Sequence, residues 1–403
     1  MPYPPYRGDK LKIYNLACQL AESHELHLLT IAENQEDINA VKELLIPSQT
    51  NHVTLQDDQS SNRKRIFTQL HWIFRPKWYS SIAAVLGLMG HRPLQVAFFR
   101  SWKFEKLLKK VLEENNYDAI HVQHIRMAQY FEDFVPTQAI LDLPDAFSLY
   151  WKRRVEAAPN PWEKWFRNLE YRRLANYEKQ ILPTFSKVLV CSKEDQEYLK
   201  NQGIDNVDLL PNGVNLQTFS SQGKEKLIPN RILFTGNMDY APNVDAVQYF
   251  VKDILPLIEE KLPQVEFIIA GQRPVKPVLD LAKHNIHVTG FVQNLANEYA
   301  VAHVVISPLR IGAGTQNKVL EALAMNKAVV CSNVGFKGLG IENGTGILMA
   351  ETPVEFANQV VSVLKSDEIR DRLGEMGGKH VRDTFSWYAI SQLLIKHFNS
   401  INQ

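Results

Sequence analysis

Short apolar runs alternate with amphipathic segments through both halves of this sequence, and that alternation restricts the folds it can form. The apolar runs of the first half cover 25–31, 119–123, 139–142 and 188–191. Those of the second half cover 231–235, 265–270, 287–289, 304–306 and 328–330. Short strands separated by helices are typical of parallel α/β sheets. Because 403 residues are too many for one core, the sequence predicts two α/β domains.

The boundary between the two halves is predicted near residue 225. Residues 211–229 contain Pro211-Asn-Gly213 and a Ser-Ser-Gln-Gly stretch, a composition typical of loops and linkers. The expected domains are therefore 1–225 and 226–385, followed by a C-terminal helical segment over 386–403. Segment 161–182 is predicted to form one long amphipathic helix whose charged residues lie on a solvated face.

Composition excludes several classes of protein. The net charge of +1 gives no reason to expect a nucleic-acid partner. Cys18, Cys191 and Cys331 are far apart and lack metal-ligand spacing, which fits a reduced cytoplasm. No signal peptide is recognisable. The longest apolar run, 82–89, is far shorter than the roughly 20 residues that span a bilayer. We expect a cytoplasmic protein, or one bound peripherally at the inner face of the membrane.

The most informative stretch for function joins a buried strand to a helix through a glycine loop. The strand 304–306 is followed by Gly312-Ala-Gly314, and the helix is expected to begin near Thr315. Arg310 and Lys318 flank the helix start, and Glu321 follows about one turn further along. Backbone N–H groups at a helix N-terminus, with two cations beside them, are suited to a phosphate or diphosphate. A carboxylate close by is placed to accept hydrogen bonds from ribose hydroxyls. The stretch predicts a nucleotide-diphosphate site.

Other candidate residues follow strands of the first half. His124 lies just beyond the strand 119–123, where parallel α/β folds bind ligands. Asp142 and Asp145 follow another strand end, although Asp145 has the alternative role of capping the next helix. The stretch Arg7-Gly8-Asp9-Lys10 is either a plain helix start or a loop for phosphate or acceptor. A zinc site is not expected because no third ligand is evident.

Segment 62–110 combines basic residues with aromatic ones. Its basic residues are Arg63, Lys64, Arg65, Arg75, Lys77, Arg92, Arg100, Lys103, Lys106, Lys109 and Lys110, and Glu105 is the only acid between Asn62 and Lys110. Trp72, Trp78 and Trp102 are among the aromatic residues interleaved with them. This mixture suits an anionic membrane surface. The alternative is a solvated face over ordinary core aromatics.

Four motifs together resemble the retaining glycosyltransferases of the GT-B fold, family 4, also called group 1. Pro211-Asn-Gly-Val214 is similar to that family's interdomain turn, and the stretch from Phe234 to Asn243 is similar to its nucleotide-domain glycine loop. The stretch from Gln316 to Ala324, with the strand after it, is similar to the donor-site helix, and residues 4–10 are similar to the first loop. The resemblance is greatest to a bacterial branch linked to extracellular polysaccharide assembly.

The resemblance implies an α/β protein of two Rossmann-like domains with parallel sheets facing across a cleft, and a last helix that crosses back to the first domain. It implies transfer of a sugar from a UDP- or GDP-linked donor to a hydroxyl of a glycan, lipid-linked or small-molecule acceptor. Anomeric configuration would be retained, and the leaving-group oxygen would act as base. Neither a cofactor nor a metal is expected, because cationic side chains and a helix dipole would stabilise the leaving diphosphate.

Site roles follow from the same resemblance. The catalytic residues are predicted to be His124, Arg310 and Lys318. The donor-binding residues are predicted to be Gly236, Asn237, Gly312, Gly314, Thr315, Gln316, Asn317 and Glu321. The acceptor or interdomain loop is predicted to comprise Arg7, Gly8, Asp9 and Lys10, together with Asp145.

Three features depart from the family pattern. The first glutamate of a common pair is replaced by Ala313, and the usual Arg and Lys after the first glycine loop are replaced within Asn237-Met238 and Pro242-Asn243. The sequence also begins at the Pro-Pro loop, so the expected first strand is either lacking or lost by truncation of the sequence. Two alternatives therefore stay open: a sugar-nucleotide epimerase of the same fold, and a catalytically degenerate glycan-binding subunit.

Overall fold

The computed structural model describes residues 8–45, 66–76, 90, 92–156, 158–220, 227–311 and 315–401, and it confirms the predicted α/β class with parallel sheets. The chain forms two compact units, one of residues 1–210 with 391–403 and the other of residues 211–390. The second unit begins at Pro211 and not near residue 225, because the Asn-Gly-Val turn packs against the second unit. The Val214 N–H donates to the carbonyl of Phe385 at 2.8 Å, and the Val214 side chain is buried in that unit's core.

In the first unit the strands form two parallel sheets among the described residues. One sheet pairs β1 (His27–Ala32) with β2 (Gln69–Phe74), and the other has the order β3-β4-β5-β6. The latter strands are β3 (Ile120–Gln123), β4 (Ala139–Leu143), β5 (Lys187–Val190) and β6 (Val207–Leu209). Strands β2 and β6 were not predicted, because one is half-exposed and the other spans only three residues.

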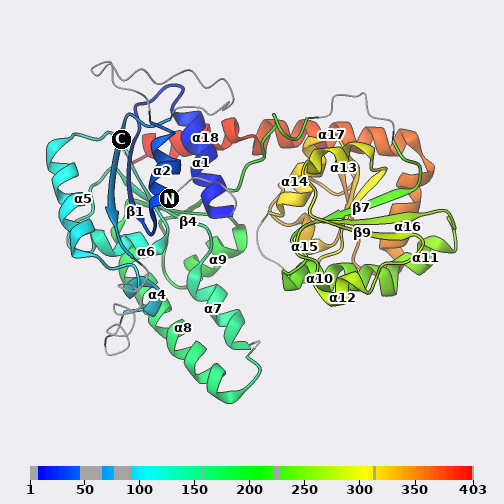
Figure 1. Ribbon diagram of the computed structural model, residues 1–403, viewed down its shortest axis with the longest axis horizontal. Coiled ribbons are helices and arrows are strands. Elements are labelled where there is room, and N and C mark those ends of the chain that lie inside the picture. The colour runs from blue at the N-terminus through cyan, green and yellow to red at the C-terminus, as the bar shows by residue number, and fades with distance from the viewer. Residues whose placement is uncertain are drawn as a thin grey trace. The chain divides into compact units, whose positions relative to one another are not determined.

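The helices of the first unit pack on both faces of the four-stranded sheet (Figure 1). They are α1 (Gly8–Leu20), α2 (Gln35–Lys42), α4 (Leu94–Ala97), α5 (Trp102–Glu114), α6 (Ile125–Ala128), α7 (Phe147–Glu156), α8 (Pro161–Ile181) and α9 (Lys193–Asn201), with short 3-10 turns at Gln129–Phe131 and Leu182–Thr184. Strand β4 shows why both faces are covered: Leu141 packs in the core with α5, α6 and α8, whereas Asp142 points to the opposite face and meets α1.

The long helix predicted over 161–182 exists as α8, but the assignment of its charged residues to a solvated face is wrong in part. Glu170 and Glu178 are buried. The Glu170 carboxylate accepts N–H groups of Leu94 and Gln95 at the start of α4, and Glu178 accepts the N–H and hydroxyl of Ser148 in α7. These carboxylates cap neighbouring helices, a role that amphipathic periodicity cannot reveal.

The second unit has one six-stranded parallel sheet in the order β12-β11-β10-β7-β8-β9. Its strands are β7 (Arg231–Thr235), β8 (Glu266–Ala270), β9 (Ile286–Gly290), β10 (Val304–Ser307), β11 (Val329–Cys331) and β12 (Ile347–Met349). Alternation along β7 shows that both faces are buried: Ile232 and Phe234 belong to one core and Leu233 to the other.

Helices cover each face of this sheet (Figure 1). The first face carries α10 (Ala241–Tyr249), the π-turn Phe250–Ile254, α11 (Leu255–Glu259), α12 (Lys276–Leu279) and α16 (Pro353–Lys365). The other face carries α13 (Leu295–Val301), α14 (Asn317–Ala324) and α17 (Asp367–Phe385); α15 (Asn333–Phe336) follows β11. The last helix, α18 (Trp387–Asn399), belongs to the second unit up to Ile390 and to the first unit from Ser391. None of the described helices is long and apolar enough to cross a bilayer.

Candidate functional site

The strand order of the second unit places a ligand crevice beside β7. The chain passes from β7 through β8 to β9 on one side and then returns to β10 on the other side of β7. In open parallel sheets, ligands bind beyond the carboxyl ends of the strands where the order reverses in this way. The loops after β7 and β10 meet this condition, and they contain Gly236, Asn237 and Arg310.

The loop after β7 is held by close packing against the loop after β8. A side chain at Gly271 would place its Cβ 1.7 Å from the carbonyl oxygen of Gly236, so no other residue fits there. Gly236 in turn lies against the Asn243 amide, which a Cβ at Gly236 would approach within 2.5 Å. The Asn243 amide donates to the carbonyl of Asn237 at 2.9 Å, and the Gln272 amide donates to the Asn237 side chain at 2.9 Å. The predicted donor loop therefore has a fixed backbone.

Lys318 contacts the Asn243 side chain beside this loop, although it belongs to α14, which follows β10. It is the second residue of α14, and its side chain is buried. The Lys318 ammonium donates to the Asn243 amide oxygen at 2.6 Å and lies 4.5 Å from the centre of the Phe234 ring. Burial lowers the pKa of Lys318 to about 7, and Glu321 only partly opposes this. A buried cation with one neutral partner is suited to an anionic ligand.

Glu321 lies one turn along α14 from Lys318, as the spacing predicted. Its Oε2 atom accepts the Tyr299 hydroxyl at 2.9 Å, and that hydroxyl also contacts the Thr235 hydroxyl at 2.6 Å. Burial raises the pKa of Glu321 to about 7, against the opposing effects of Tyr299 and Lys318. Burial and the neighbouring Glu321 raise the pKa of Tyr299 well above its ordinary value, so Tyr299 stays a donor. This network fixes one carboxylate oxygen of Glu321.

Arg310 follows β10 and pairs with a carboxylate of α10. Its Nε donates to Asp245 in α10 at 3.0 Å, and its terminal nitrogen forms a second ion-pair contact with the same carboxylate. The guanidinium also lies 4.7 Å from the centre of the Tyr249 ring, and half of the side chain is exposed (53%). Arg310 is therefore already paired, whereas Lys318 has no carboxylate within ion-pair distance among the described residues.

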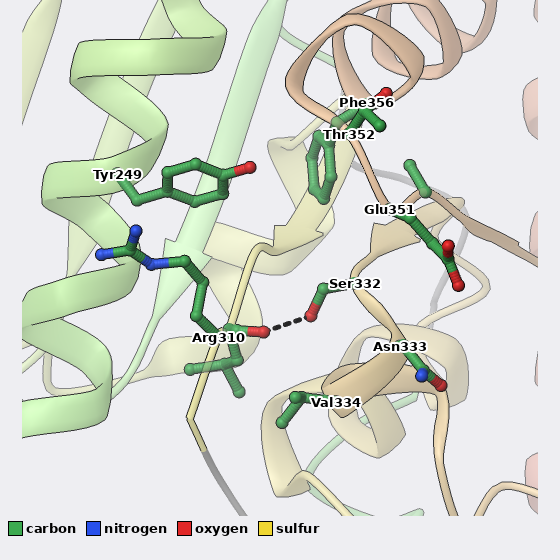
Figure 2. Close-up of a pocket in the computed structure, with 10 residues that line it drawn as sticks. Tyr249, Arg310, Ser332, Asn333, Val334, Glu351, Thr352 and Phe356 are labelled. Carbon is green, nitrogen blue, oxygen red and sulfur yellow. Dashed lines mark hydrogen bonds between the residues drawn. The ribbon is translucent and has the colours of Figure 1, made fainter.

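A pocket of about 280 Å³ opens beside Arg310 (Figure 2). It lies at the carboxyl ends of β10, β11 and β12, and the Ser332 hydroxyl closes one side by donating to the Leu309 carbonyl. Its lining residues are Tyr249, Leu309, Arg310, Ser332, Asn333, Val334, Ala350, Glu351, Thr352 and Phe356.

The rest of the predicted glycine loop is only partly described. Gly312, Ala313 and Gly314 lie outside the described residues. Thr315 and Gln316 precede α14, which begins at Asn317 rather than near Thr315. The Thr315 hydroxyl is buried and forms no hydrogen bond to the residues that the structure describes. A Cβ added at Gly338 would lie 3.0 Å from this hydroxyl oxygen, so residues 315–316 pack against the segment that follows α15.

His124 of the first unit has an unusual backbone. It links β3 to α6 with a positive φ of 78°, which is uncommon for a residue other than glycine. The ring packs against Phe147 at a centroid distance of 4.5 Å, and its Nδ1 accepts the Arg126 N–H. Burial, followed by the charge of Arg126, lowers the pKa of His124 to about 3. A strained neutral imidazole at a strand end fits an acceptor site better than a charged role.

Asp145 is not the cap of the next helix, the alternative role considered for it. At the start of α7 the N–H of Ala146 donates to Asp195 at 3.0 Å, and that of Ser148 donates to Glu178 at 3.1 Å. The Asp145 side chain remains exposed. Although solvent reaches it, partial enclosure and then Asp195 raise its pKa to about 6. Of the predicted acceptor loop, Arg7 and the side chain of Asp9 lie outside the described residues, and Gly8 and Lys10 are in the first turn of α1.

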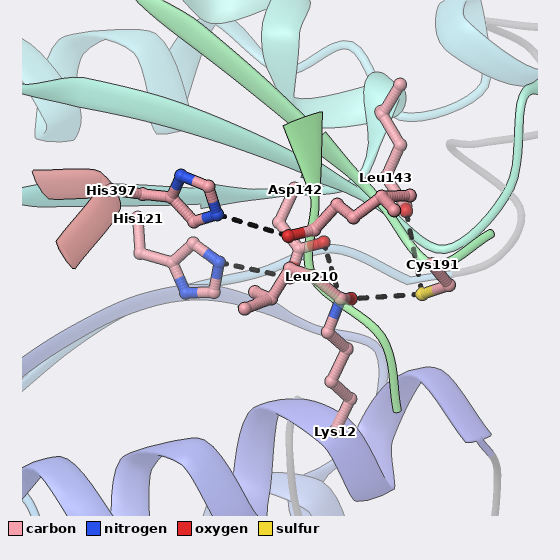
Figure 3. Close-up of polar contacts among 8 residues, drawn as sticks. Lys12, His121, Asp142, Leu143, Cys191, Leu210 and His397 are labelled. Carbon is pink, nitrogen blue, oxygen red and sulfur yellow. Dashed lines mark hydrogen bonds and ion pairs between the residues drawn. The ribbon is translucent and has the colours of Figure 1, made fainter. Parts of the chain in front are cut away.

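Asp142 was a candidate for contact with substrate. Its burial excludes that contact and gives it a structural role. It is fully buried and pairs with Lys12 of α1 at 2.8 Å and with His121 at 3.2 Å (Figure 3). Lys12 also donates to the carbonyl of Leu210 at 2.8 Å and to the thiol of Cys191 at 3.4 Å. These contacts attach α1 to the ends of β4, β5 and β6.

Sequence reasoning missed Lys12, Asn243 and Tyr299. Lysine in an amphipathic helix and asparagine after proline are ordinary surface residues, and a single tyrosine carries no motif. The signal for Asn243 is the departure from the family pattern at that position. Among the described residues, no group of three or more His, Cys, Asp or Glu side chains is arranged to hold a metal ion.

Comparisons with solved structures agree with this architecture. Sucrose-phosphate synthase from Thermosynechococcus elongatus superposes with a TM-score of 0.65 at 15% identity, over 98% of this chain and 94% of that one. A glycosyltransferase from Rickettsia africae gives 0.63 at 14% identity, over 99% and 97%. Anabaena HepE in complex with UDP and glucose gives 0.62 at 13% identity, over 98% and 96%. These structures show that the fold is GT-B, with two Rossmann-like domains.

Sequence comparisons cover both units. A curated relative from Klebsiella pneumoniae, an uncharacterised 44.6 kDa protein in the cps region, is 23% identical over 198 residues, which are 47% of this chain. The chain spans about half the length (50%) of that relative. The family described as "Glycosyl transferases group 1" matches residues 229–366, and the one described as "Glycosyltransferase Family 4" matches residues 13–218, half of the chain. The chain therefore belongs to glycosyltransferase family 4 and has the GT-B fold.

Proposed function

We propose that this glycosyltransferase transfers a sugar from a UDP- or GDP-linked donor to a hydroxyl group, with retention at the anomeric carbon. The observation that carries the proposal is the pair formed by the buried Lys318 and the half-buried Glu321 at the strand-order reversal of the second unit. The cation is suited to the diphosphate, and the carboxylate, held by Tyr299, is suited to ribose hydroxyls. UDP is the first nucleotide to test, because the structurally similar Anabaena HepE was solved with UDP and with UDP-glucose.

The chief barrier to such a reaction is charge separation as the diphosphate leaves the sugar. Lys318 and the N-terminus of α14 would stabilise the leaving group electrostatically, which removes the need for a metal. Arg310 would add to this only by exchanging Asp245 for phosphate. The proposal that a leaving-group oxygen acts as base, and that configuration is retained, rests on resemblance to the family.

On the acceptor side, the proposed residues are His124, Asp145 and the loop 7–10. His124 is neutral and Asp145 is exposed, so both are suited to hydrogen-bonding a sugar hydroxyl. We propose a glycan or lipid-linked acceptor in exopolysaccharide synthesis, for which the cps-region relative is the support. The site of action would be the cytoplasm or the inner face of the membrane.

Peripheral membrane contact through segment 62–110 stays a prediction. Arg75 does not contribute, because it is buried and donates to the carbonyl of Phe98 at 2.5 Å. Helix α5 does present Lys106, Lys109 and Lys110 to solvent, with Lys109 paired to Glu105 at 3.1 Å. The residues Arg63 to Arg65 lie outside the described part of the chain.

A panel of sugar nucleotides separates the proposed transferase from the two alternatives. A ligand at 100 times its dissociation constant adds about 2.7 kcal/mol of stability, so thermal stabilisation identifies the donor. Incubation with that donor and a set of acceptors then gives a new glycoside from a transferase, an isomeric sugar nucleotide from an epimerase, or neither from a binding subunit. Stabilisation by none of the sugar nucleotides would contradict the proposal.

The role of Glu321 gives a specific prediction. Glu321→Gln is expected to weaken binding of the identified nucleoside diphosphate by about tenfold or more, since hydrogen bonds to charged groups contribute about 1.5–3 kcal/mol. The 2′-deoxy nucleotide should bind the variant nearly as well as the ribonucleotide does. Titration calorimetry measures all four affinities, and Glu368→Gln, at an exposed position on α17, is the matched control. Equal discrimination against the deoxy nucleotide in wild type and variant would refute the ribose role.

A further inference from the structure

The outer half of α8 leaves the core of the first unit. Its buried residues, Glu170, Leu174, Tyr177, Glu178 and Ile181, all belong to the inner half, and none of residues 161–169 is buried. Helix α7, its antiparallel neighbour, buries only Ser148. Figure 1 shows the two helices running out together beyond the strands of this unit. The residues 151–167, hereafter the hairpin tip, therefore contribute little to the core of their own unit.

The hairpin tip nevertheless carries large apolar side chains. Trp162 is 72% exposed, Trp165 57% and Phe166 38%. Positions three and four apart lie on one face of a helix, so the three rings share a surface. The two indole rings stack with centroids 5.2 Å apart and an angle of 24° between their planes. An exposed aromatic cluster of this kind is uncommon on a surface with no partner.

Basic residues outnumber acidic ones in the hairpin tip. The tip contains Lys152, Arg153, Arg154, Lys164 and Arg167, against only Glu156 and Glu163 as acids. Lys152, Arg154 and Lys164 are exposed, whereas Arg153 pairs with Glu194 and Arg167 pairs with Glu163. Lys152, Arg154 and Lys164 form no ion pair with the residues that the structure describes, although Arg154 lies 4.9 Å from the centre of the Trp151 ring.

Hydrogen bonds cap the start of α8 and connect it to α7. Asn160 caps α8 by accepting the N–H of Glu163 at 2.9 Å, and Pro161 occupies the first helical position. The Arg167 guanidinium joins the two helices by donating to the carbonyl of Arg154 at 2.9 Å. The aromatic rings are therefore presented in a fixed arrangement before any partner binds, which reduces the entropy cost of binding.

We propose that the hairpin tip binds the surface of an anionic phospholipid bilayer. Tryptophan beside lysine and arginine is the composition that proteins place at the headgroup level, where indoles bury apolar area and cations meet lipid phosphates. A second copy of the chain is a poorer partner. A two-fold contact would bring the same patch against itself and would oppose cations to cations. This proposal does not depend on the transfer reaction.

Flotation with vesicles tests the proposal on the full chain. Wild-type protein is expected to float with vesicles of phosphatidylglycerol and phosphatidylcholine and to stay at the bottom with phosphatidylcholine alone. The double variant Trp162→Ser/Trp165→Ser should lose about tenfold or more of its partition coefficient, because the apolar area that enters the headgroup layer is gone. Its thermal midpoint should not fall, since both side chains are exposed.

Phe134→Ser is the matched control, because Phe134 is also in the first unit and 70% exposed but follows two acids, Glu132 and Asp133. It should leave the partition coefficient unchanged. The triple change Lys106→Ser/Lys109→Ser/Lys110→Ser, run in parallel, reports separately on helix α5. Transfer to a water-soluble acceptor should survive in the tip variant, so its loss from membranes is distinguishable from failure of the proposed function.

Two results would overturn the proposal. One is equal flotation of the wild type and the double tryptophan variant on anionic vesicles. The other is a concentration-dependent dimer in sedimentation velocity that the double variant abolishes, which would assign the tip to contact between copies of the chain.

Discussion

Asp142→Ala is expected to lower the free energy of unfolding of the first unit by about 3–5 kcal/mol, the usual cost of leaving one member of a buried ion pair without its partner. The Lys12 ammonium would keep only neutral partners, the Leu210 carbonyl and the Cys191 thiol. Denaturant titration of the full chain measures the change. Asp280→Ala, which breaks an exposed pair with Lys276, should change stability by less than about 1 kcal/mol.

A double variant makes this prediction sharper. Lys12→Met/Asp142→Leu replaces the ion pair with apolar side chains of similar size, an exchange that is often neutral. It should recover most of the stability that Asp142→Ala loses. If Asp142→Ala costs no more than Asp280→Ala, or if the double variant is as unstable as the single one, the ion pair does not hold α1 on the sheet.

The same pair predicts how stability depends on pH. Burial alone would raise the pKa of Asp142, but Lys12 and His121 together lower it below its ordinary value of 3.8. A carboxyl whose folded pKa is depressed contributes stability that is present above pH 3.8 and is lost as the pH falls through the folded pKa. The difference in stability between wild type and Asp142→Ala should therefore shrink below pH 3.8.

Lys318→Met is expected to weaken binding of the nucleoside diphosphate by about 10- to 150-fold, which corresponds to roughly 1.5–3 kcal/mol for a charge-assisted hydrogen bond. The loss cannot come from unfolding, because methionine in place of a buried lysine removes an unfavourable burial of charge and should leave the thermal midpoint unchanged or higher. Arg310→Met should weaken binding less, because Asp245 already neutralises that guanidinium and half of it is exposed.

The pKa values near this site predict whether affinity for the diphosphate rises or falls with pH. Both Lys318 and Glu321 have pKa values of about 7 in the free protein. As the pH rises through 7, the lysine loses its charge, which weakens its contact with the diphosphate. Affinity for the diphosphate should therefore fall from about pH 6 to about pH 8, and Lys318→Met should flatten that dependence. Titration calorimetry at several pH values measures it, with exposed Lys276→Met as control. A wild-type affinity that rises over this interval would contradict the assignment of Lys318 to the diphosphate.

Much of the fold follows from local pattern. The predicted strands, including 231–235 and 304–306, correspond to β7 and β10 within a residue or two, because a buried parallel strand needs a run of apolar side chains that can be read directly. The same logic places Lys318 and Glu321 one turn apart on a helix. The three-residue strands β6 and β12 were missed, whereas β11, of the same length, was predicted.

Tertiary structure decided which polar and aromatic side chains are inside. Lys12 and Trp162 show this: the lysine, on helix α1, is buried against Asp142, and the tryptophan, on helix α8, is 72% exposed. Asn243 acquires its importance only because α10 brings it to the Lys318 ammonium, 75 residues away in the chain. Periodicity reports which face of an element is apolar. It contains no information on what another part of the chain brings to that face, and hydrogen bonds and ion pairs between distant residues depend on that.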